Sequence, residues 1–169
     1  MRVFHGSNIE INHIDFSKCR PFKDFGRGFY LTTIRRQAEM MANRVVRIYG
    51  GVPCITVYEL DEKIFLDNEI KVRVFERPNK EWALFVINNR NRNFNPASDK
   101  ECNLDNKYDM VTGPIADDDL ALLFRQFSNG MIDVDTLVRE MEYKELTNQF
   151  SFHTEKSLKY LKKVEVIYG

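Results

Sequence analysis

The stretch "DFGRGFYLTT" (24–33) combines two features that predict how the N-terminal part of the chain folds. Two glycines flank a single arginine, and an aromatic, β-branched run follows them, which indicates a turn that leads into a strand over 28–33. Beyond this strand, apolar residues recur at helical spacing until a pair of glycines, so a helix is expected over 34–49. A short apolar start over 1–5 precedes this unit and predicts a first strand.

The rest of the chain continues with more strands than helices. Alternating and β-branched residues predict further strands over 54–60, 63–67, 70–75, 108–115, 149–154 and 164–168. Helical spacing predicts further helices over 79–89, 116–127, 133–143 and 155–163. Thr154 is a candidate cap for the last helix, and the asparagine-rich segment 90–107 is expected to be an exposed loop. Because strands outnumber helices and do not alternate with them, we expect an α+β fold with mostly antiparallel pairing.

The composition narrows the class of protein. A length of 169 residues with 43% hydrophobic and 12% aromatic residues predicts one folded domain over 1–169. Lysine plus arginine and aspartate plus glutamate each number 25, so the chain lacks the positive charge typical of non-specific nucleic-acid binding. The three cysteines stand far apart, no signal peptide precedes them, and no apolar run approaches the ~20 residues of a membrane helix. We therefore expect reduced thiols, a cytoplasmic location and no membrane contact.

Three short stretches contain candidate functional residues, although each has an ordinary explanation when it is taken singly. His5 in "FHGSN" (4–8) is a polar residue near a terminus. "GRGFY" (26–30) is a turn before a core strand, and "NQFSF" (148–152) is the start of another strand. Their order along the chain, however, follows the pattern of a known family.

In that order, the three stretches resemble the ADP-ribosyltransferases, in the branch that contains the poly(ADP-ribose) polymerases and the diphtheria-type toxins. "FHGS" is similar to the H-G-S start of the family's catalytic domain, "FGRGFYLTT" with its following helix to the glycine–tyrosine segment, and "NQFSFHTEKSLKYLKKVEV" to the closing strand. The positions correspond to an H-Y-E signature in which Glu, Asp or Gln fills the third place. The whole chain also resembles a bacterial group of unknown function marked by H-G-S-N, D-F-G-x-G-F-Y-L-T and Y-D-x-V-x-G-P-x-A-D-D.

The resemblance implies a fold and a set of residue roles. The fold would consist of two small, mostly antiparallel sheets around a cleft that binds NAD as a substrate, with no metal. In that cleft His5 would bond the adenosine-side ribose, Tyr30 would stack on the nicotinamide ring, and Gln149 would hold the nicotinamide-side ribose. The remaining contacts with NAD would come from Gly6, Ser7 and Gly28 along the strands and from Arg20, Lys23 and Arg27 near the pyrophosphate.

Gln149 departs from the glutamate of the H-Y-E enzymes. An amide keeps the hydrogen bond to ribose but lacks the negative charge beside the developing ribosyl cation, and losing one such stabilising group typically costs ~10²–10³ in rate. On this basis Gln149→Glu is predicted to release nicotinamide at least as fast as the wild type. A substitute base is expected in "GPIADDDLA" (113–121), where Asp118, and after it Asp117, are the candidates. Asp119 fits a helix N-terminus instead.

Three further residues test how far the resemblance extends. His153 lies four residues beyond Gln149, on the same face of the expected strand, and is a candidate for lining the site. Met40 and Met41 occupy the region where the toxin branch has a second tyrosine that covers the nicotinamide. A thioether can cover an aromatic face, but it leaves that face more open.

The function that the resemblance implies is cleavage of the nicotinamide–ribose bond of NAD and transfer of ADP-ribose to an acceptor that the sequence does not identify. The balanced charge favours a protein over a nucleic acid as acceptor, and the toxin-like branch adds an antitoxin or inhibitor protein as a candidate partner. Three alternatives stay open: an inactive module that binds NAD or ADP-ribose, an NAD glycohydrolase, and an enzyme that removes an RNA 2′-phosphate. The last normally needs a cluster of basic residues, which the sequence does not show.

Overall fold

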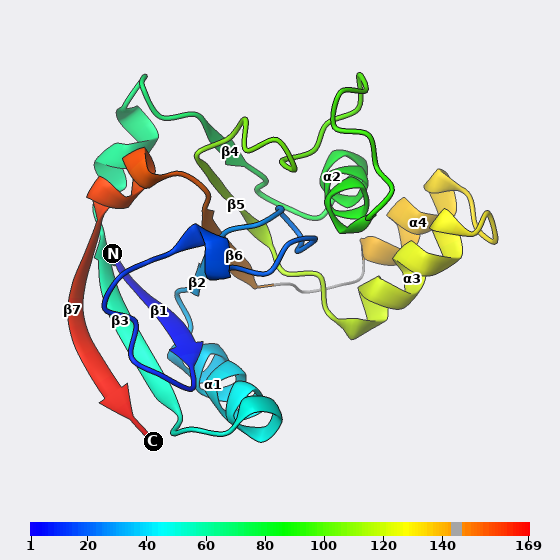
Figure 1. The fold of residues 1–169 in the computed structure, drawn as a ribbon. Coiled ribbons are helices and arrows are strands. Elements are labelled where there is room, and N and C mark those ends of the chain that lie inside the picture. The colour runs from blue at the N-terminus through cyan, green and yellow to red at the C-terminus, as the bar shows by residue number, and fades with distance from the viewer. Residues whose placement is uncertain (143–146) are drawn as a thin grey trace.

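The computed structural model describes residues 1–142 and 147–169, and its centre is a single seven-stranded sheet (Figure 1). The strands lie in the order β4-β5-β6-β2-β1-β3-β7. Their bounds are β1 Arg2–Ser7, β2 Phe29–Thr32, β3 Cys54–Leu60, β4 Val72–Val74, β5 Met110–Pro114, β6 Asn148–Phe152 and β7 Leu161–Tyr168. β4 and β5 pair in parallel, and the other neighbours pair antiparallel. The structure thus confirms an α+β class with mostly antiparallel pairing. The expectation of two separate sheets was wrong, because all seven described strands belong to one sheet.

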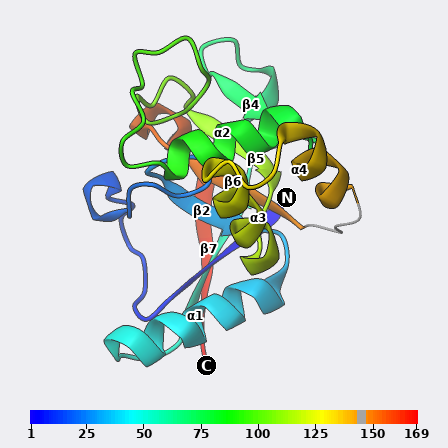
Figure 2. The same ribbon diagram turned by 90° about the vertical axis from the view of Figure 1, so that its right-hand side faces the viewer.

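The α-helices of the described chain lie on one side of this sheet (Figure 2). They are α1 Arg35–Tyr49, α2 Lys80–Arg90, α3 Asp118–Ser128 and α4 Val134–Met141. α1 packs against β1, β2 and β3, whereas α2, α3 and α4 pack on one another. The helices that the sequence predicted in these places are confirmed to within two residues at each end. Tyr143, at the end of the fourth expected helix, lies outside the described residues.

The segment 63–67, for which a strand was expected, is not part of the sheet. It belongs to a 3₁₀ helix over Glu62–Leu66. The side chain of Asp61 accepts a hydrogen bond from the backbone nitrogen of Lys63 at 3.0 Å and so starts the helical turn. A side-chain cap therefore overrides the apolar, strand-like run that follows it.

The helix expected over 155–163 is also shorter than predicted. A 3₁₀ helix covers Glu155–Tyr160, and the chain then enters β7 at Leu161 because β7 pairs with β3 from that residue onward. Thr154 occupies the N-cap position as expected, but its side chain makes no capping hydrogen bond, since its hydroxyl donates to Asp109 Oδ1 at 2.7 Å. Pairing between strands outweighs the local helical preference of this segment.

The pairing between neighbouring strands is shortest at the centre of the sheet, where β1 meets β2. The two strands share a single register pair, Phe4↔Thr32, whereas β1 pairs with β3 along its whole length. Beyond that pair the strands separate, and we call the gap between residues 5–7 of β1 and 29–31 of β2 the split. The split divides the sheet into a β4-β5-β6-β2 half and a β1-β3-β7 half, which remain joined in one sheet where the family resemblance implied two.

Hydrophobic cores support the sheet, and the first of them contains residues from both sides of the split. One core gathers residues from strands and 3₁₀ helices, among them Val3, Phe29, Leu31, Tyr58, Leu60, Ile64, Met110, Phe150 and Phe152. A second core lies under α2, α3 and α4 and includes Phe25, Phe75, Trp82, Phe85, Val111, Leu120 and Phe124. A small third core joins Ala38 of α1 to Ile55 and Val57 of β3. The candidate site lies where residues of all three cores meet the split.

Gly6 allows α1 to approach β1 closely. A Cβ atom at this position would lie 1.9 Å from the backbone oxygen of Ala38 and 2.9 Å from the backbone nitrogen of Ala42. Both alanines are buried, so the contact is between a strand and a helix that carry almost no side chain there. The sequence led us to assign the missing Cβ of Gly6 to the approach of NAD, but the structure shows that the packing of α1 already requires a glycine.

Gly6→Ala is expected to destabilise the protein by about 2–3 kcal/mol, because the clashing atoms belong to a helix backbone that must shift as a unit. For a chain of this length the melting temperature would fall by about 5–10 °C, which calorimetry would measure. Gly169→Ala is the matched control, since its Cβ would meet Pro53 at an ordinary 3.4 Å. Equal melting of Gly6→Ala and the wild type would contradict this account of the packing.

Candidate functional site

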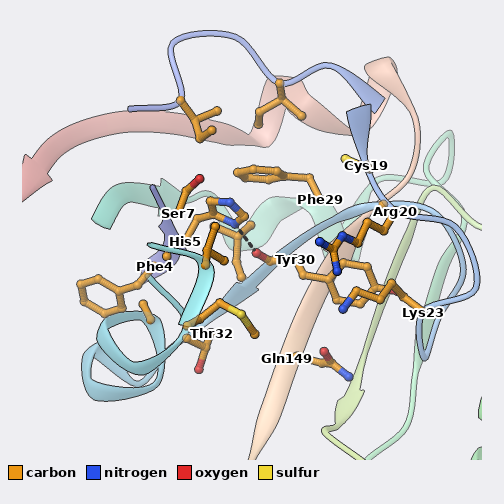
Figure 3. Close-up of a pocket in the computed structure, with 18 of the residues that line it drawn as sticks. Phe4, His5, Ser7, Cys19, Arg20, Lys23, Phe29, Tyr30, Thr32 and Gln149 are labelled. Carbon is orange, nitrogen blue, oxygen red and sulfur yellow. Dashed lines mark hydrogen bonds between the residues drawn. The ribbon is translucent and has the colours of Figure 1, made fainter. Parts of the chain in front are cut away.

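A cleft of about 540 Å³ occupies the split between β1 and β2 (Figure 3). Its walls come from both strands, from α1 and from the segment 8–28 that connects β1 to β2. Ile115, which follows β5, and Gln149 of β6 complete the lining. The volume lies within the range of pockets that hold small molecules and cofactors. The cleft is therefore the candidate site, and its chemistry follows from the side chains that line it.

His5 offers the cleft a hydrogen-bond acceptor. Its ring stacks on Phe29 with 4.3 Å between centroids, and its Nδ1 lies 2.8 Å from the backbone oxygen of Tyr30. Because a carbonyl oxygen only accepts, Nδ1 must carry the hydrogen. Burial lowers the pKa of His5, against the smaller effect of the bond to Tyr30, so the ring is neutral near pH 7. Its Nε2 has no partner among the described residues and remains an acceptor.

Tyr30 presents its ring to the cleft and its hydroxyl to the preceding turn. The hydroxyl donates to Gly26 O at 2.8 Å and accepts from Phe25 N at 3.0 Å. Desolvation, and after it the negative charge of Asp24, raises the pKa of Tyr30 well above its ordinary value, so the phenol stays protonated. The ring packs 6.4 Å from Phe25 and 6.4 Å from His153, measured between centroids. These contacts fix a flat aromatic surface before any ligand arrives.

Gln149 turns its amide oxygen toward the cleft. The residue lies on β6 opposite Thr32 and is 8% exposed. Its Nε2 lies 3.0 Å from Asp24 Oδ2 and 3.4 Å from the backbone oxygen of Pro114. Both partners only accept hydrogen bonds, so the amide nitrogen faces them and Oε1 points the other way, as Figure 3 shows. No described residue bonds Oε1, which leaves a second acceptor at the cleft.

The structure thus brings His5, Tyr30 and Gln149 from three strands to one cleft, as the sequence led us to expect. Gly6, Ser7, Arg20 and Gly28 also line it. Ser7 ends β1 and is half-buried. A Cβ at Gly28 would lie 2.6 Å from His153 Nδ1, so the close approach expected at this glycine is toward a histidine of the protein itself.

Positive charge gathers along one part of the cleft. Arg20, Lys23 and Arg44 line it, and none of the three has an ion-pair partner among the described residues. Arg20 bonds the hydroxyl of Tyr49, and its guanidinium lies 5.3 Å from the centroid of that ring. Desolvation lowers the pKa of Lys23, and the nearby arginines lower it further against the opposing charge of Asp24. Cations without carboxylate partners favour an anionic ligand.

Arg27 is not one of these cations, although we expected it to face a pyrophosphate. Its Nη1 donates to Ser17 O at 3.2 Å and to Cys19 O at 2.8 Å, and the residue does not line the cleft. The two bonds tie the 3₁₀ helix Phe16–Lys18 to the turn before β2. Arg27 therefore shapes the connecting segment, and Arg44 of α1 supplies the cation that the sequence did not single out.

The two aspartates proposed as a substitute base lie elsewhere. Asp117 accepts a hydrogen bond from Leu120 N at 2.9 Å and caps α3, and Asp118 is the exposed first residue of that helix. Neither lines the cleft, although Ile115 just before them does. Both acids complement the positive end of the helix dipole, which is the role that the sequence suggested for Asp119 alone.

His153 lies behind the cleft and does not line it. The residue is 3% exposed, its Nδ1 donates to Arg27 O at 2.7 Å, and its Nε2 lies 2.8 Å from Ser151 Oγ. β6 ends one residue earlier, at Phe152, so the alternation of strand faces no longer applies at this position. Of the two methionines considered, Met41 lines the cleft and Met40 is 64% exposed.

Asp24 is the site residue that reasoning from the sequence missed. It is 8% exposed, and its Oδ1 accepts from Arg90 Nε at 2.9 Å and from Arg90 Nη2 at 2.6 Å. Its Oδ2 accepts from Gln149 and from Ala116 N at 3.2 Å. The available signal was a lone aspartate directly before the "FGRGFY" run, and nothing local in the sequence connects it to Gln149.

Residues 1–142 and 147–169 contain no group of three or more His, Cys, Asp or Glu side chains placed to hold a metal ion. The helices of this described part are all too short or too polar to cross a membrane. Cys19, Cys54 and Cys102 are free thiols.

Comparison with known proteins gives a family but no activity. No curated protein matches the chain, and no solved structure does. The model of a family described as "Protein of unknown function (DUF3990)" matches residues 1–163. Because that match covers almost the whole chain, the protein belongs to the DUF3990 family.

Proposed function

We propose that this protein is an NAD-dependent ADP-ribosyltransferase, which breaks the nicotinamide–ribose bond and transfers ADP-ribose to an acceptor. The observation that carries the proposal is the meeting of His5, Tyr30 and Gln149 at one cleft in the split of the sheet. These are the residues that match the H-Y-E signature of the resemblance, with glutamine in the third place. They come from β1, β2 and β6, so their meeting depends on the fold and not on closeness in the sequence.

The chemistry of the cleft supports NAD as the ligand. The two acceptors, His5 Nε2 and Gln149 Oε1, suit hydroxyl groups of ribose, which can donate hydrogen bonds. The fixed ring of Tyr30 suits the flat nicotinamide ring. The cations Arg20 and Lys23, with Arg44 of α1, suit the pyrophosphate. A dinucleotide carries all three kinds of group on one molecule.

In the proposed reaction the bond between the nicotinamide nitrogen and the ribose carbon breaks, and its electron pair leaves with nicotinamide. Positive charge then develops on the ribosyl group, near which Gln149 Oε1 would supply the negative end of an amide dipole. A nucleophile of the acceptor attacks the same carbon and loses its proton. Within the described lining, Asp15 is the one carboxylate, and Ser17 bonds it at 2.6 Å. The proton therefore passes to water or to a group of the acceptor.

An inactive module that binds NAD or ADP-ribose is the second candidate, and one observation favours it. Gln149 has no charge, and both oxygens of the neighbouring Asp24 are already engaged by hydrogen bonds. An enzyme without a carboxylate at this place loses an electrostatic contribution that typically amounts to ~10²–10³ in rate. Binding needs only the acceptors, the ring and the cations.

NAD is expected to raise the melting temperature, because a ligand that binds only the native state stabilises it. At a hundredfold excess over Kd the gain is about 2.7 kcal/mol, or about 5–11 °C for a chain of this length. Differential scanning calorimetry with NAD and ADP-ribose would measure it, with adenosine and nicotinamide as controls that each carry one part of the ligand. Unchanged melting in millimolar NAD would refute both candidates.

Chromatography of the same mixtures separates the two candidates. Release of nicotinamide that depends on the protein, with label from NAD appearing on a macromolecule, supports transfer. Release without such label indicates an NAD glycohydrolase. Binding without release, in the presence of host lysate as a source of acceptors, supports the inactive module.

A further inference from the structure

Asp24 contacts Gln149 on the side that faces away from the cleft. The carboxylate lies in the segment before β2 and is almost fully buried. Arg90, the last residue of α2, holds it through two nitrogens, at 2.9 Å and 2.6 Å from Oδ1. The other oxygen, Oδ2, lies 3.0 Å from Gln149 Nε2. Nothing in the proposed reaction uses Asp24 directly, because it does not line the cleft.

We propose that Asp24 is a positioning residue, which fixes the amide of Gln149 with its oxygen toward the cleft and makes glutamine the residue that this site requires at position 149. The geometric half of the inference stands on the contacts alone. The functional half rests on the proposed function, since it assumes that Gln149 Oε1 bonds the ligand.

The orientation of the amide follows from the chemistry of its neighbours. A glutamine amide can be turned over with little change in shape, which exchanges a donor for an acceptor. Here the nitrogen lies between two groups that only accept, Asp24 Oδ2 and Pro114 O. Turning the amide over would bring Oε1 against both of them and leave two repulsive contacts. Asp24 therefore ensures that the cleft meets an acceptor and not a donor.

Arg90 keeps Asp24 in place for this task. Its two nitrogens anchor the single oxygen Oδ1, and its guanidinium lies 5.8 Å from the ring centroid of Phe124. It also donates to Ala116 O at 3.4 Å, while Ala116 N donates to Asp24. The carboxylate is thus oriented by α2 and by Ala116, neither of which lines the cleft.

This arrangement removes the gain that the sequence suggested for Gln149→Glu. A glutamate at 149 would place a carboxylate oxygen about 3 Å from Asp24 Oδ2, where Gln149 Nε2 now lies. Two carboxylates at such a distance do not both ionise, so one takes up a proton or they move apart. A protonated glutamate would donate to Asp24 and keep an uncharged oxygen toward the cleft, as glutamine does, whereas movement apart would displace that oxygen. In neither case does the cleft gain an ordered, charged carboxylate.

A charge swap tests the inference. Asp24→Asn alone would keep its oxygen on Arg90 and turn its amide nitrogen toward Gln149, at the cost of the bond from Ala116 N. Gln149 would then turn over to accept from that nitrogen, which presents a donor to the cleft. In the double variant Asp24→Asn/Gln149→Glu, the new amide nitrogen donates to one oxygen of the glutamate, and the other oxygen faces the cleft. The double variant has the same total charge as the wild type across residues 24, 90 and 149.

The first measurement needs no ligand. Carbon NMR with labelled glutamate is expected to show that the carboxyl group introduced by Gln149→Glu has a pKa well above the ordinary value of about 4.3, and that in the double variant its pKa is close to that value. Gln37→Glu is the matched control, because Gln37 also lines the cleft but bonds the hydroxyls of Thr32 and Thr147. The carboxyl group introduced there should titrate normally. An ordinary titration at position 149 with Asp24 in place would overturn the inference.

The second measurement is ADP-ribose affinity by calorimetry, together with nicotinamide release where the wild type shows it. Asp24→Asn is expected to lose about a hundredfold, as for removal of one oriented polar group, and Gln149→Glu is expected to lose as much once the pH exceeds the raised pKa of its carboxyl group. The double variant should stay within about tenfold of the wild type at the same pH. If Gln149→Glu does not fold but the double variant does, the rescue supports the inference. If the double variant is as impaired as Gln149→Glu, repulsion from Asp24 is not the cause and the inference fails. A wild type that binds no nucleotide refutes the proposed function, while the titration still decides the geometric half.

Discussion

Replacing Arg20 and Arg44 by glutamine and Lys23 by methionine is expected to weaken the binding of NAD and ADP-ribose about a hundredfold. The three cations line the cleft and have no ion-pair partner among the described residues, so the pyrophosphate would be their counter-charge. All three are exposed, and a contact between exposed charges contributes at most about 1 kcal/mol. Three such contacts together correspond to about two powers of ten in Kd. Calorimetric titration of the triple variant measures the effect.

Two controls make the prediction specific. Nicotinamide riboside has no pyrophosphate, so its binding should be nearly the same in the triple variant and the wild type. Arg36 and Arg47 are exposed residues of α1 outside the cleft lining, and replacing both by glutamine should leave NAD binding unchanged. The wild type should also lose affinity as salt rises, more steeply than the triple variant does. An equal loss for NAD and nicotinamide riboside would indicate damage to the fold and contradict the assignment of the cations.

Lowering the pH from 6.5 to about 4 is expected to remove about 3 kcal/mol of stability through His153 alone. Burial lowers the pKa of His153 from 6.5 to about 4, against smaller opposing effects of Arg27 O and Asp109. The unfolded chain therefore binds a proton in this window that the native protein does not, and stability falls as the pH falls. The lowered pKa of His5 acts in the same direction. For this length the loss corresponds to about 6–12 °C in melting temperature.

Urea denaturation at pH 7 and pH 4.5 would measure this loss, and variants would assign it. His153→Gln should be less stable at pH 7, because it disturbs the bonds to Arg27 O and Ser151, but its stability should depend less on pH. His13→Gln is the control, since His13 is exposed and its replacement should leave the pH dependence unchanged. A His153→Gln protein with the same pH dependence as the wild type would show that another group titrates.

The framework of the fold could be predicted because its signals are local. The turn and aromatic run before β2, and the apolar spacing of α1 up to its terminal glycines, depend on residues that are neighbours in the chain. The 3₁₀ helix over Glu155–Tyr160 was mistaken for a longer helix because the pairing of β7 with β3 is a long-range effect. Local patterns do not record which strand a segment will join.

The site was predictable to the extent that a family resemblance named its residues, and no further. The resemblance pointed to His5, Tyr30 and Gln149, and the fold places all three at one cleft. The contact between Asp24 and Gln149 depends on the register of β6 and on the path of the segment before β2, which no sequence pattern encodes. For the same reason a glutamate at position 149 appeared harmless until the neighbouring carboxylate was located.

Because β1 and β2 share a single register pair, a ligand bound in the split would connect the two strands mechanically. The backbone carbonyl of Tyr30 faces β1, where the His5 ring bonds it, so the N–H of Tyr30 faces the split as well. A molecule bound there can form hydrogen bonds with polar groups of both strands at once, in place of the backbone hydrogen bonds that β1 and β2 do not make with each other. Its binding would then stiffen the joint between the two halves of the sheet, whose strands pair there at Phe4 and Thr32 and whose side chains meet at His5 and Phe29. A bound ligand would in this way act as part of the β-sheet, and its release would make the connection between the two halves flexible again.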